Sequence, residues 1–337
     1  MNQTLLTNNT AIPLSMAVWL ALDEYDHNPD DRYISATGLI KSTRQIILGQ
    51  RLPPQTEGNM KDISQLMASR IGTAVHSSIE SSWLNHYKSS LKRLRYSDKV
   101  IARVKINPKP EELTPETIPI YMELRSMREI DGVTIGGKFD FIGNGTLEDF
   151  KTTGVYSYTS GSNDWKYKLQ GSIYRWLNPE LITNDHMIID YIFTDWSRRD
   201  SCVKADKGYP PTKVFAHKIL LLSLPETEMW IKNKIAAIKN FQDQPEANLP
   251  LCNAQELWQD APTYKYYKNP EKTLKSTKNF NTSAEATIRW IEDGKMGQIV
   301  TQPGKVTACK YCDAFSICSQ KDNLIASGLL QGEGVSQ

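Results

Sequence analysis

The stretch GGKFDFIGNGTLEDFKTT, residues 136–153, contains two short apolar runs on either side of a tight turn. The turn Gly143-Asn144-Gly145 predicts a β-hairpin, because Asn and Gly tolerate the positive φ angles that a two-residue loop demands. Each run also carries an acid, Asp140 in the first and Asp149 in the second, and Lys151 follows the second acid by two residues. Two carboxylates and an ammonium on one hairpin are unusual and require an explanation.

Carboxylates at the ends of a strand pair can lie within a few ångströms of each other. Hard oxygen ligands at such a separation suit Mg²⁺ or Mn²⁺. A lysine beside them can orient a water molecule or neutralise charge that develops on a phosphate, and such an assembly performs metal-assisted phosphodiester hydrolysis. A lone Asp-x-Lys also fits a solvated hairpin with a cross-strand ion pair, so this motif needs further support.

Three further features support the metal site. Gly137 precedes the first acid by three residues. Downstream, Gln170 and Tyr174 are spaced i, i+4 and therefore lie on one face of a predicted helix. Upstream, the stretch IGTAVHSSIE places His76 within a predicted helix, four residues before Glu80.

Together these residues resemble the RecB-like branch of the PD-(D/E)XK nuclease superfamily, whose members show a helix histidine, then G-x-x-D, D-x-K and Q-x-x-x-Y. The corresponding elements of this chain are His76, Gly137-Lys-Phe-Asp140, Asp149-Phe-Lys151 and Gln170-Gly-Ser-Ile-Tyr174. The matched region runs from about Ser35 to Asp195, and the ordered set of motifs is more specific than any one of them. The resemblance implies an α/β fold with a restriction-endonuclease-like core, a central mixed β-sheet flanked by helices, and an irregular C-terminal metal-binding cap.

The resemblance also implies a role for each motif residue. Lys151 would position or activate the attacking water, and Gln170 and Tyr174 would hold the DNA strand near the scissile phosphate. The divalent metal would be bound by the carboxylates of Asp140 and Asp149, the His76 ring and the Phe150 carbonyl.

Three neighbouring acids have weaker claims on this site. Glu80 is one helical turn from His76 and fits either a group behind the metal ligands or an exposed helix charge. Glu148 adjoins Asp149, but the alternation of side chains along a strand directs it to the other face. Glu123, which precedes the hairpin, is a further candidate for the metal site.

The tail ACKYCDAFSICSQ contains Cys309, Cys312 and Cys318, and Cys252 lies earlier, in PLCNAQELW. Four thiolates are enough for a tetrahedral metal or a cubane cluster. The tail resembles the C-terminal cysteine triad of RecB-like nucleases that carry a [4Fe–4S] cluster, including the AddB subunit and the CRISPR adaptation exonucleases. In those families the fourth cysteine lies N-terminal to the nuclease core, whereas this chain has no cysteine before Cys202. Cys252 is therefore the expected fourth ligand, with Cys202 as the other candidate. Zinc is the alternative metal, and free buried thiols without a metal are the third alternative.

The remaining pattern predicts helices and strands around these motifs. A cap at Ser35 or Thr37 favours a helix over residues 34–48. Further helices are predicted over 13–27, 63–92 with a break near Gly72, 164–177 and 225–241, and strands over 118–127, 186–196 and 213–224. The predicted domains are an N-terminal helical segment (1–62), a nuclease core (63–244) and a cysteine-containing cap and tail (245–337).

The bulk composition limits the partners and the compartment. The chain has 337 residues, 39% hydrophobic content and a formal charge of +2, so any nucleic-acid surface must come from local patches. No run approaches the length of a membrane span, and the N-terminus lacks the pattern of a secretory signal, so a cytoplasmic protein is expected. Eight basic residues fall between Lys88 and Lys109. A second basic series interleaves Lys265, Lys268, Lys272, Lys275 and Lys278 with Tyr264, Tyr266, Tyr267 and Phe280.

The sequence therefore predicts a Mg²⁺- or Mn²⁺-dependent DNA exonuclease for recombination or DNA processing, encoded by a bacteriophage and acting in the host cytoplasm. DNA is the expected substrate, and a phage single-strand annealing or binding protein is the expected partner. The alternative is a catalytically inactive DNA-binding or inhibitor protein on a nuclease fold.

Overall fold

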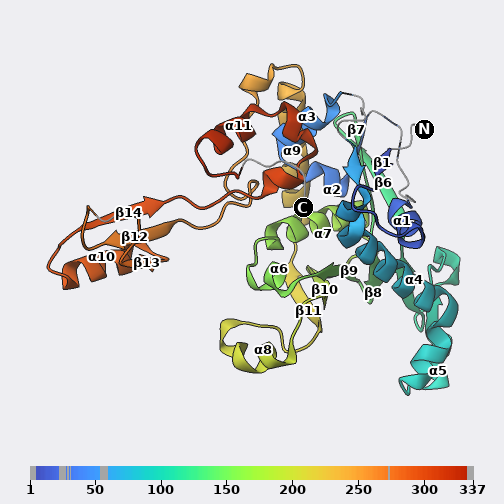
Figure 1. Cartoon of the computed structure of the whole chain (residues 1–337). Helices are drawn as coiled ribbons and strands as arrows, with labels where there is room; N and C mark the ends of the chain where they lie inside the picture. Colours follow the sequence, from blue (N-terminus) through green and yellow to red (C-terminus); the bar gives the residue numbers. More distant parts are fainter. Residues whose placement is uncertain are drawn as a thin grey trace. The chain divides into compact units, whose positions relative to one another are not determined.

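The computed structural model of the chain describes residues 5–22, 28, 30, 32–53, 60–271 and 274–331. The chain divides into two compact units, which can be followed by their sequence colours in Figure 1. The first unit comprises Met1–Ile40 and Pro53–Ala237, and the second comprises Lys41–Leu52 and Ile238–Gln337. Residues 41–52, which the sequence assigns to an N-terminal helical segment, thus belong with the C-terminal part of the chain.

The first unit is built on a six-stranded sheet with the order β11-β10-β9-β8-β5-β4. Strands β9 and β10 run parallel, as do β4 and β5, and the other neighbours run antiparallel. The central mixed sheet predicted from the sequence is thereby confirmed. Its strands are β4 (Val104–Ile106), β5 (Ile118–Met122), β8 (Phe141–Gly143), β9 (Thr146–Thr153), β10 (His186–Phe193) and β11 (Val214–Leu220).

The hairpin between β8 and β9 also forms as predicted. Gly143 pairs with Thr146, so the loop consists of two residues. Asn144 has a φ of 50° and Gly145 a φ of 74°, as a tight hairpin requires. The turn therefore fixes the register that carries Asp149 into the middle of the sheet.

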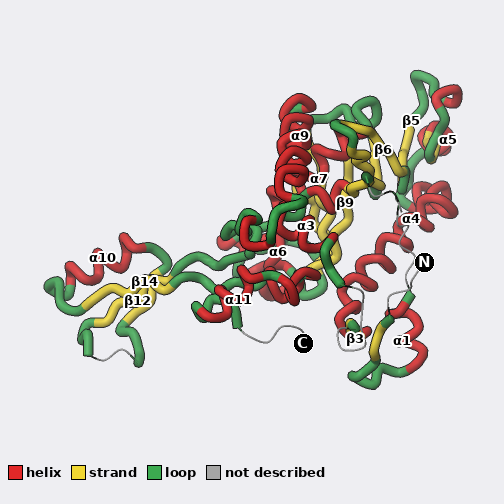
Figure 2. The backbone as a smooth tube through the Cα atoms, turned by 90° about the horizontal axis from the view of Figure 1, so that it is seen from above, coloured by secondary structure: helices red, strands yellow, loops and turns green. Residues whose placement is uncertain are grey.

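Two helices cover opposite faces of β9, because neighbouring residues of a strand point to opposite sides. Helix α7 (Asp164–Leu177) contacts the face of Asp149, to which Gln170 donates a hydrogen bond. Helix α4 (Met67–Arg93) lies on the face of Phe150, which belongs to the core cluster against which Ile79 and Trp83 pack. Figure 2 shows the strands of this region with α4 and α7. The strand is thus sandwiched between helices.

A smaller sheet of the first unit, with the order β2-β7-β6, delivers the first acid. Asp140 lies in the bend between β7 and β8, where the chain passes from the small sheet to the six-stranded one. Glu123 lies at the reverse crossing, between β5 and β6, with a φ of 52°. The single strand predicted over 118–127 is therefore wrong, since the backbone turns at Glu123. The strands are β2 (Tyr33–Ser35), β6 (Arg125–Ile130) and β7 (Val133–Lys138).

The other helices of the first unit follow the predicted order. The described part of the predicted first helix forms α1, and residues 23–27 of that prediction lie outside the described residues. A 3-10 turn, Ile63–Leu66, leads into α4, which continues without a break through Gly72. The remaining elements are α1 (Leu14–Ala21), α2 (Ala36–Leu39), α5 (Asp98–Arg103), α6 (Val155–Thr159), α8 (Arg198–Val203), α9 (Leu224–Phe241, which ends in the second unit), β1 (Leu6–Thr7) and β3 (Lys61–Asp62).

The single helix predicted over 34–48 is instead two helices. Ser35 caps α2 as predicted, since its side chain accepts a hydrogen bond from Gly38 N. Ser42 then starts α3 (Thr43–Gln50): its Oγ accepts from Gln45 N, and the Gln45 side chain accepts from Ser42 N. This reciprocal capping box begins a new helix at the point where the chain enters the second unit.

The second unit contains regular structure beyond the irregular cap that the sequence predicts. A three-stranded antiparallel sheet, β13-β12-β14, packs against α10. The alternation of tyrosine and lysine in TYKYY follows the two-residue period of a strand, and Tyr266 is fully buried. The elements of this unit are α3, β12 (Thr263–Tyr267), β13 (Lys278–Phe280), α10 (Ser283–Glu292), β14 (Gln298–Gln302) and α11 (Ser319–Ala326), with short 3-10 turns at Ala308–Tyr311 and Asp313–Ile317.

No helix among the described residues is both long and apolar enough to cross a lipid bilayer.

The packing of β7 against α7 leads to a first prediction. A Cβ atom on Gly137 would lie 2.5 Å from Cε1 of Tyr174, whose ring is buried. We expect Gly137→Ala to lower the free energy of unfolding by about 1–3 kcal/mol, because the helix must shift from the strand. Chemical denaturation with urea measures the change.

Gly72→Ala is the matched control. No atom lies within 4 Å of a Cβ at Gly72, which is inside α4, so the substitution should stabilise the helix by up to about 1 kcal/mol. Equal free energies of unfolding for the two variants would contradict the close packing at Gly137.

Candidate functional site

The structure brings the two motif acids and the lysine together in the first unit. Asp149 is only 1% exposed, and its carboxylate forms an ion pair with the Lys151 ammonium. The oxygen that meets the ammonium is Oδ2, and within the described part of the chain it accepts no further hydrogen bond. A buried carboxylate oxygen without a hydrogen-bond donor is costly unless a cation compensates for the lost water.

The Asp140 carboxyl interacts electrostatically with both members of the Asp149–Lys151 pair. Its Oδ2 accepts a hydrogen bond of 2.9 Å from the backbone nitrogen of Phe150. Burial, and then the nearby charge of Asp149, raise the pKa of the Asp140 carboxyl to about 7. The two carboxylates therefore repel each other in a water-poor place, and a divalent cation between them would relieve that repulsion.

Lys151 remains an ammonium in this environment. Burial lowers the pKa of Lys151, but the carboxylates of Asp149 and Asp140 raise it by more, so the pKa lies above its ordinary value. The ammonium also lies over the ring of Tyr167, 5.7 Å from its centroid. Sequence analysis does not single out Tyr167, although it precedes Gln170 by three residues and so shares its face of α7.

A second set of donors surrounds Asp140. One ligand atom each from His76, Glu123 and Asp140 lie within 4.8 Å of one another. His76 Nδ1 is 3.5 Å from Asp140 Oδ2, and His76 Nε2 is 2.9 Å from the carbonyl oxygen of Phe150. Glu123 also forms an ion pair with Lys138. Its place in this set follows from the left-handed backbone turn between β5 and β6.

Gln170 and Tyr174 reach this site through Asp149. Gln170 Nε2 lies 3.0 Å from Asp149 Oδ1 and donates to it, and the same nitrogen is 3.3 Å from the Tyr174 hydroxyl. Tyr174 is 5% exposed. The structure thus shows both residues positioning the acid, and a contact with DNA stays a prediction for them.

The donors present fit a hard divalent cation. They are carboxylate oxygens, one backbone carbonyl and one imidazole, which is the set that Mg²⁺ and Mn²⁺ accept in proteins. Burial and the charge of Asp149 raise the pKa of Asp140, which indicates that the groups around Asp140 compensate its negative charge only in part. Of the groups predicted from the sequence as metal ligands, His76 and Asp140 lie in one set with Glu123, whereas Asp149 pairs with Lys151, and metal binding stays a prediction.

The opposite face of β9 carries a separate acidic pair. Glu148 points away from Asp149, as strand alternation predicts, and meets Asp190 of β10. Burial, then the Asp190 charge and a hydrogen bond to its carboxylate, raise the pKa of Glu148 to about 7. One proton is therefore shared between these two carboxyls near neutral pH.

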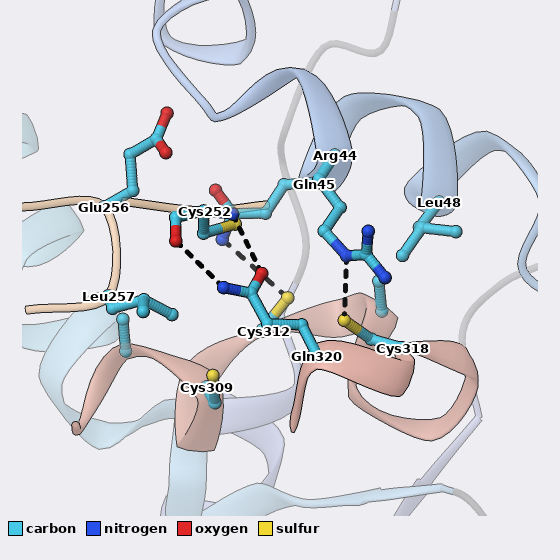
Figure 3. Close-up of a pocket in the computed structure, with 12 residues that line it drawn as sticks. Arg44, Gln45, Leu48, Cys252, Glu256, Leu257, Cys309, Cys312, Cys318 and Gln320 are labelled. Carbon is cyan, nitrogen blue, oxygen red and sulfur yellow. Dashed lines mark hydrogen bonds between the residues drawn. The ribbon is translucent and has the colours of Figure 1, made fainter. Parts of the chain in front are cut away.

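The four cysteines of the predicted metal centre line one cavity in the second unit (Figure 3). They come from a loop (Cys252) and from the two 3-10 turns and their ends (Cys309, Cys312 and Cys318). Burial, and then the other three thiols, raise the pKa of Cys309 to about 11. Four cysteine sulfurs around one cavity are the donor set of zinc or a [4Fe–4S] cluster.

Cys202, the other candidate from the sequence, is exposed in α8 of the first unit and is not among the residues that line the cavity. All five cysteines are free thiols.

The two predicted nucleic-acid patches differ. The basic residues between Lys88 and Lys109 are mostly exposed, at the end of α4 and in α5. In the second patch, Tyr266 and Tyr267 are buried, and the Tyr266 hydroxyl donates to the carbonyl of Met296. These two rings are therefore covered by the second unit and are not available for stacking on bases. Lys272 of this patch lies outside the described residues.

No family model and no curated protein matches this chain. Three solved structures are similar to parts of it. SSO0001 shares 17% identity and a TM-score of 0.38, over 68% of this chain and 90% of its own. A candidate exonuclease from Eubacterium rectale shares 13% identity and a TM-score of 0.34, over 69% of this chain and 96% of its own. A phage-related exonuclease from Haemophilus somnus 129PT shares 14% identity and a TM-score of 0.27, over 63% and 94%.

These sequence identities and TM-scores are too low to assign a fold or a function to this chain. The class that the structure itself defines is a mixed α/β protein with a buried acid–lysine site and, in its second unit, a four-cysteine cavity.

The Glu148–Asp190 pair leads to a prediction for stability against pH. The folded-state pKa of Glu148, about 7, lies above its ordinary value of 4.5, so the stability that its proton supplies is complete below pH 4.5 and is lost as the pH rises through 7. We expect Glu148→Gln to raise the melting temperature at pH 8 and to leave it nearly unchanged at pH 4.5. Thermal unfolding in a metal chelator measures the difference from wild type.

Glu129→Gln, an exposed position on β6, controls for the loss of one surface charge and should change little at either pH. An equal effect of Glu148→Gln at both pH values would contradict the shared proton.

Proposed function

We propose that this chain is a deoxyribonuclease that uses Mg²⁺ or Mn²⁺ to hydrolyse phosphodiester bonds, and that it acts as an exonuclease in recombination or DNA processing. The observation that carries the proposal is the contact of buried Asp149 with the Lys151 ammonium, beside Asp140. Burying charged side chains usually lowers the stability of the fold. Binding of a divalent cation and a phosphate would explain why Asp140, Asp149 and Lys151 are nevertheless placed together.

Asp140 and Asp149 would hold the cation, with the His76 ring, the Phe150 carbonyl and Glu123 as further donors. The bound cation supplies Lewis-acid stabilisation of the charge on the phosphate. Glu123 joins this set because its carboxylate lies with His76 and Asp140.

Lys151 would act on the water and the phosphate. Its ammonium stays protonated between the carboxylates, so it donates hydrogen bonds and orients the attacking water. As the water oxygen bonds to phosphorus, it would release a proton to the solvent, while the bond from phosphorus to the leaving oxygen breaks and that oxygen takes up a proton from the solvent. Positive charge at this place favours the more negative transition state.

Gln170 and Tyr174 would position Asp149, Gln170 directly and Tyr174 through Gln170. Gln170 donates to Oδ1 of Asp149 while Lys151 pairs with Oδ2, so both oxygens of this carboxylate are held in place, and the Tyr174 hydroxyl sits beside the Gln170 amide. Contact of Gln170 with the DNA strand remains part of this proposal.

The basic residues at the end of α4 and in α5 would contact the DNA backbone. Exposed lysines and arginines supply most of the affinity for phosphates, and that affinity falls steeply with salt. A phage single-strand annealing or binding protein is the proposed partner of the reaction.

The four cysteines would hold a structural metal centre, a [4Fe–4S] cluster with zinc as the alternative. The core clusters formed by the described residues near this cavity are small, such as that of Leu257, Val306 and Leu330. A metal bound by four thiolates would couple its binding to the folding of these segments.

The catalytic assignment predicts a loss of turnover without a loss of binding. We expect Asp140→Ala, Asp149→Ala and Lys151→Ala each to reduce cleavage by roughly a hundredfold or more, while DNA affinity changes only slightly, because the basic surface is intact. Cleavage of end-labelled linear DNA and binding in a chelator measure the two quantities.

Glu148→Gln, on the opposite face of β9, is the matched control and should cleave at the wild-type rate. Near wild-type cleavage by Lys151→Ala would refute the catalytic site, and DNA binding without any Mg²⁺- or Mn²⁺-dependent turnover would support an inactive DNA-binding protein. Parallel assays on closed circular DNA distinguish an exonuclease, which leaves the circle intact, from an endonuclease.

The cysteine assignment predicts that the four positions behave alike. Replacing any of Cys252, Cys309, Cys312 or Cys318 with Ser should remove the metal and lower the melting temperature, while Cys202→Ser should change neither. Elemental analysis of protein purified without oxygen identifies the metal, and absorption near 400 nm would indicate an iron–sulfur cluster. Metal-free wild-type protein would refute the centre.

A further inference from the structure

The cavity of the four cysteines is bordered by a helix that is distant in sequence. Helix α3 begins at Ser42, and its first turn faces three of the four sulfurs (Figure 3). Ser42 Oγ is 3.2 Å from Cys252 Sγ, Arg44 Nε donates to Cys318 Sγ at 3.2 Å, and Gln45 Nε2 donates to Cys312 Sγ at 3.7 Å. All these residues belong to the second unit.

Arg44 is the central member of this group. It is only 2% exposed, and a buried guanidinium is tolerated when its donors find acceptors. Its Nη1 donates to the carbonyls of Glu246 and Leu249, at 3.4 and 3.2 Å. Its Nη2 donates to Ser319 Oγ at 3.3 Å and forms an ion pair with the Glu246 carboxylate. With the bond to Cys318, all five N–H groups have an acceptor.

The acceptors of Arg44 also tie the cysteine segments together. Glu246 accepts hydrogen bonds from the backbone nitrogen and the hydroxyl of Ser319, at 3.0 and 2.9 Å, directly after Cys318. Gln320 holds Cys252 by a reciprocal pair of 2.8 Å bonds, from Cys252 N to its Oε1 and from its Nε2 to the Cys252 carbonyl. The sulfurs are therefore positioned by side chains from three parts of the sequence.

A charged donor beside sulfur has an electronic effect as well as a structural one. An N–H group that points at a thiolate withdraws electron density from it, and a charged donor forms the stronger bond. Groups behind the direct ligands typically change metal affinity by about 10–100-fold when they are removed.

We propose that Arg44 and Gln45 are positioning residues of the metal centre, whose N–H donors fix the sulfurs of Cys318 and Cys312 in place and tune the metal–sulfur bonds. This inference rests on the proposed metal centre. Lysine cannot replace Arg44, because one ammonium has three donors and no planar fork to serve five acceptors.

The test compares Arg44→Lys with Arg51→Lys in the full chain, purified without oxygen. Arg51 is the matched control because it lies at the end of the same helix and donates to the carbonyls of Gln242 and Gln244, but touches no sulfur. The rate of metal loss to a chelator and the visible absorption of the centre, after exchange with cobalt if the metal is zinc, are the two measurements.

We expect Arg44→Lys to release the metal about tenfold faster or more than wild type and to shift the sulfur-to-metal absorption, with Arg51→Lys unchanged in both. A residue that only supports the fold would lower the melting temperature without shifting the absorption of folded protein. Wild-type release and an unshifted spectrum in Arg44→Lys would overturn the role of Arg44 while leaving the metal centre intact.

Gln45→Glu decides the matter if Arg44→Lys yields too little folded protein. The substitution keeps the side-chain oxygen that caps Ser42 N, at 3.2 Å, and removes the donor to Cys312. Faster release supports the proposal, and a wild-type rate overturns it. Wild-type protein that binds no metal would instead refute the centre itself.

Discussion

A carboxylate removed from water in the middle of a sheet, paired with a partly exposed ammonium, sets the conditions for the rest of the first unit. The ion pair of Asp149 and Lys151 on β9 costs hydration that its own attraction does not fully return. A series of contacts therefore supports the Asp149–Lys151 pair. Gly137 leaves space for the Tyr174 ring, the Tyr174 hydroxyl lies beside Gln170, and Gln170 donates to Asp149. The G-x-x-D and Q-x-x-x-Y motifs are in this sense two ends of one packing arrangement.

The sequence was sufficient for the parts of this arrangement that local chemistry determines. The Asn144-Gly145 turn specifies a hairpin by its backbone preference, and strand alternation then separates Asp149 from Glu148. It was not sufficient where the chain changes sheets. Glu123 lies in a stretch that reads as one continuous strand, and only the left-handed turn at that residue brings its carboxylate to His76 and Asp140. Tyr167 could have been found, because it shares the helix face of Gln170.

In the thiol cavity, too, some residues can be predicted from local sequence spacing, whereas others are brought in from distant parts of the chain. The spacing of Cys309, Cys312 and Cys318 is a local signal, and it identified three of the four residues. The residues Ser42, Arg44 and Gln45 read only as the start of a helix. Their contacts with the sulfurs span more than two hundred residues of sequence, so no local pattern reports them.

The path of the chain through its two units has a consequence for the order of folding during synthesis. The acceptors of Arg44 emerge from the ribosome late, since Glu246 follows it by 202 residues and Cys318 by 274. Until then the guanidinium lacks its complete set of hydrogen-bond partners. Helix α3 therefore cannot dock before the rest of the second unit is made, although the residues of the first unit that flank it in sequence have already been synthesised. The second unit therefore closes around a segment that is made well before the residues it binds.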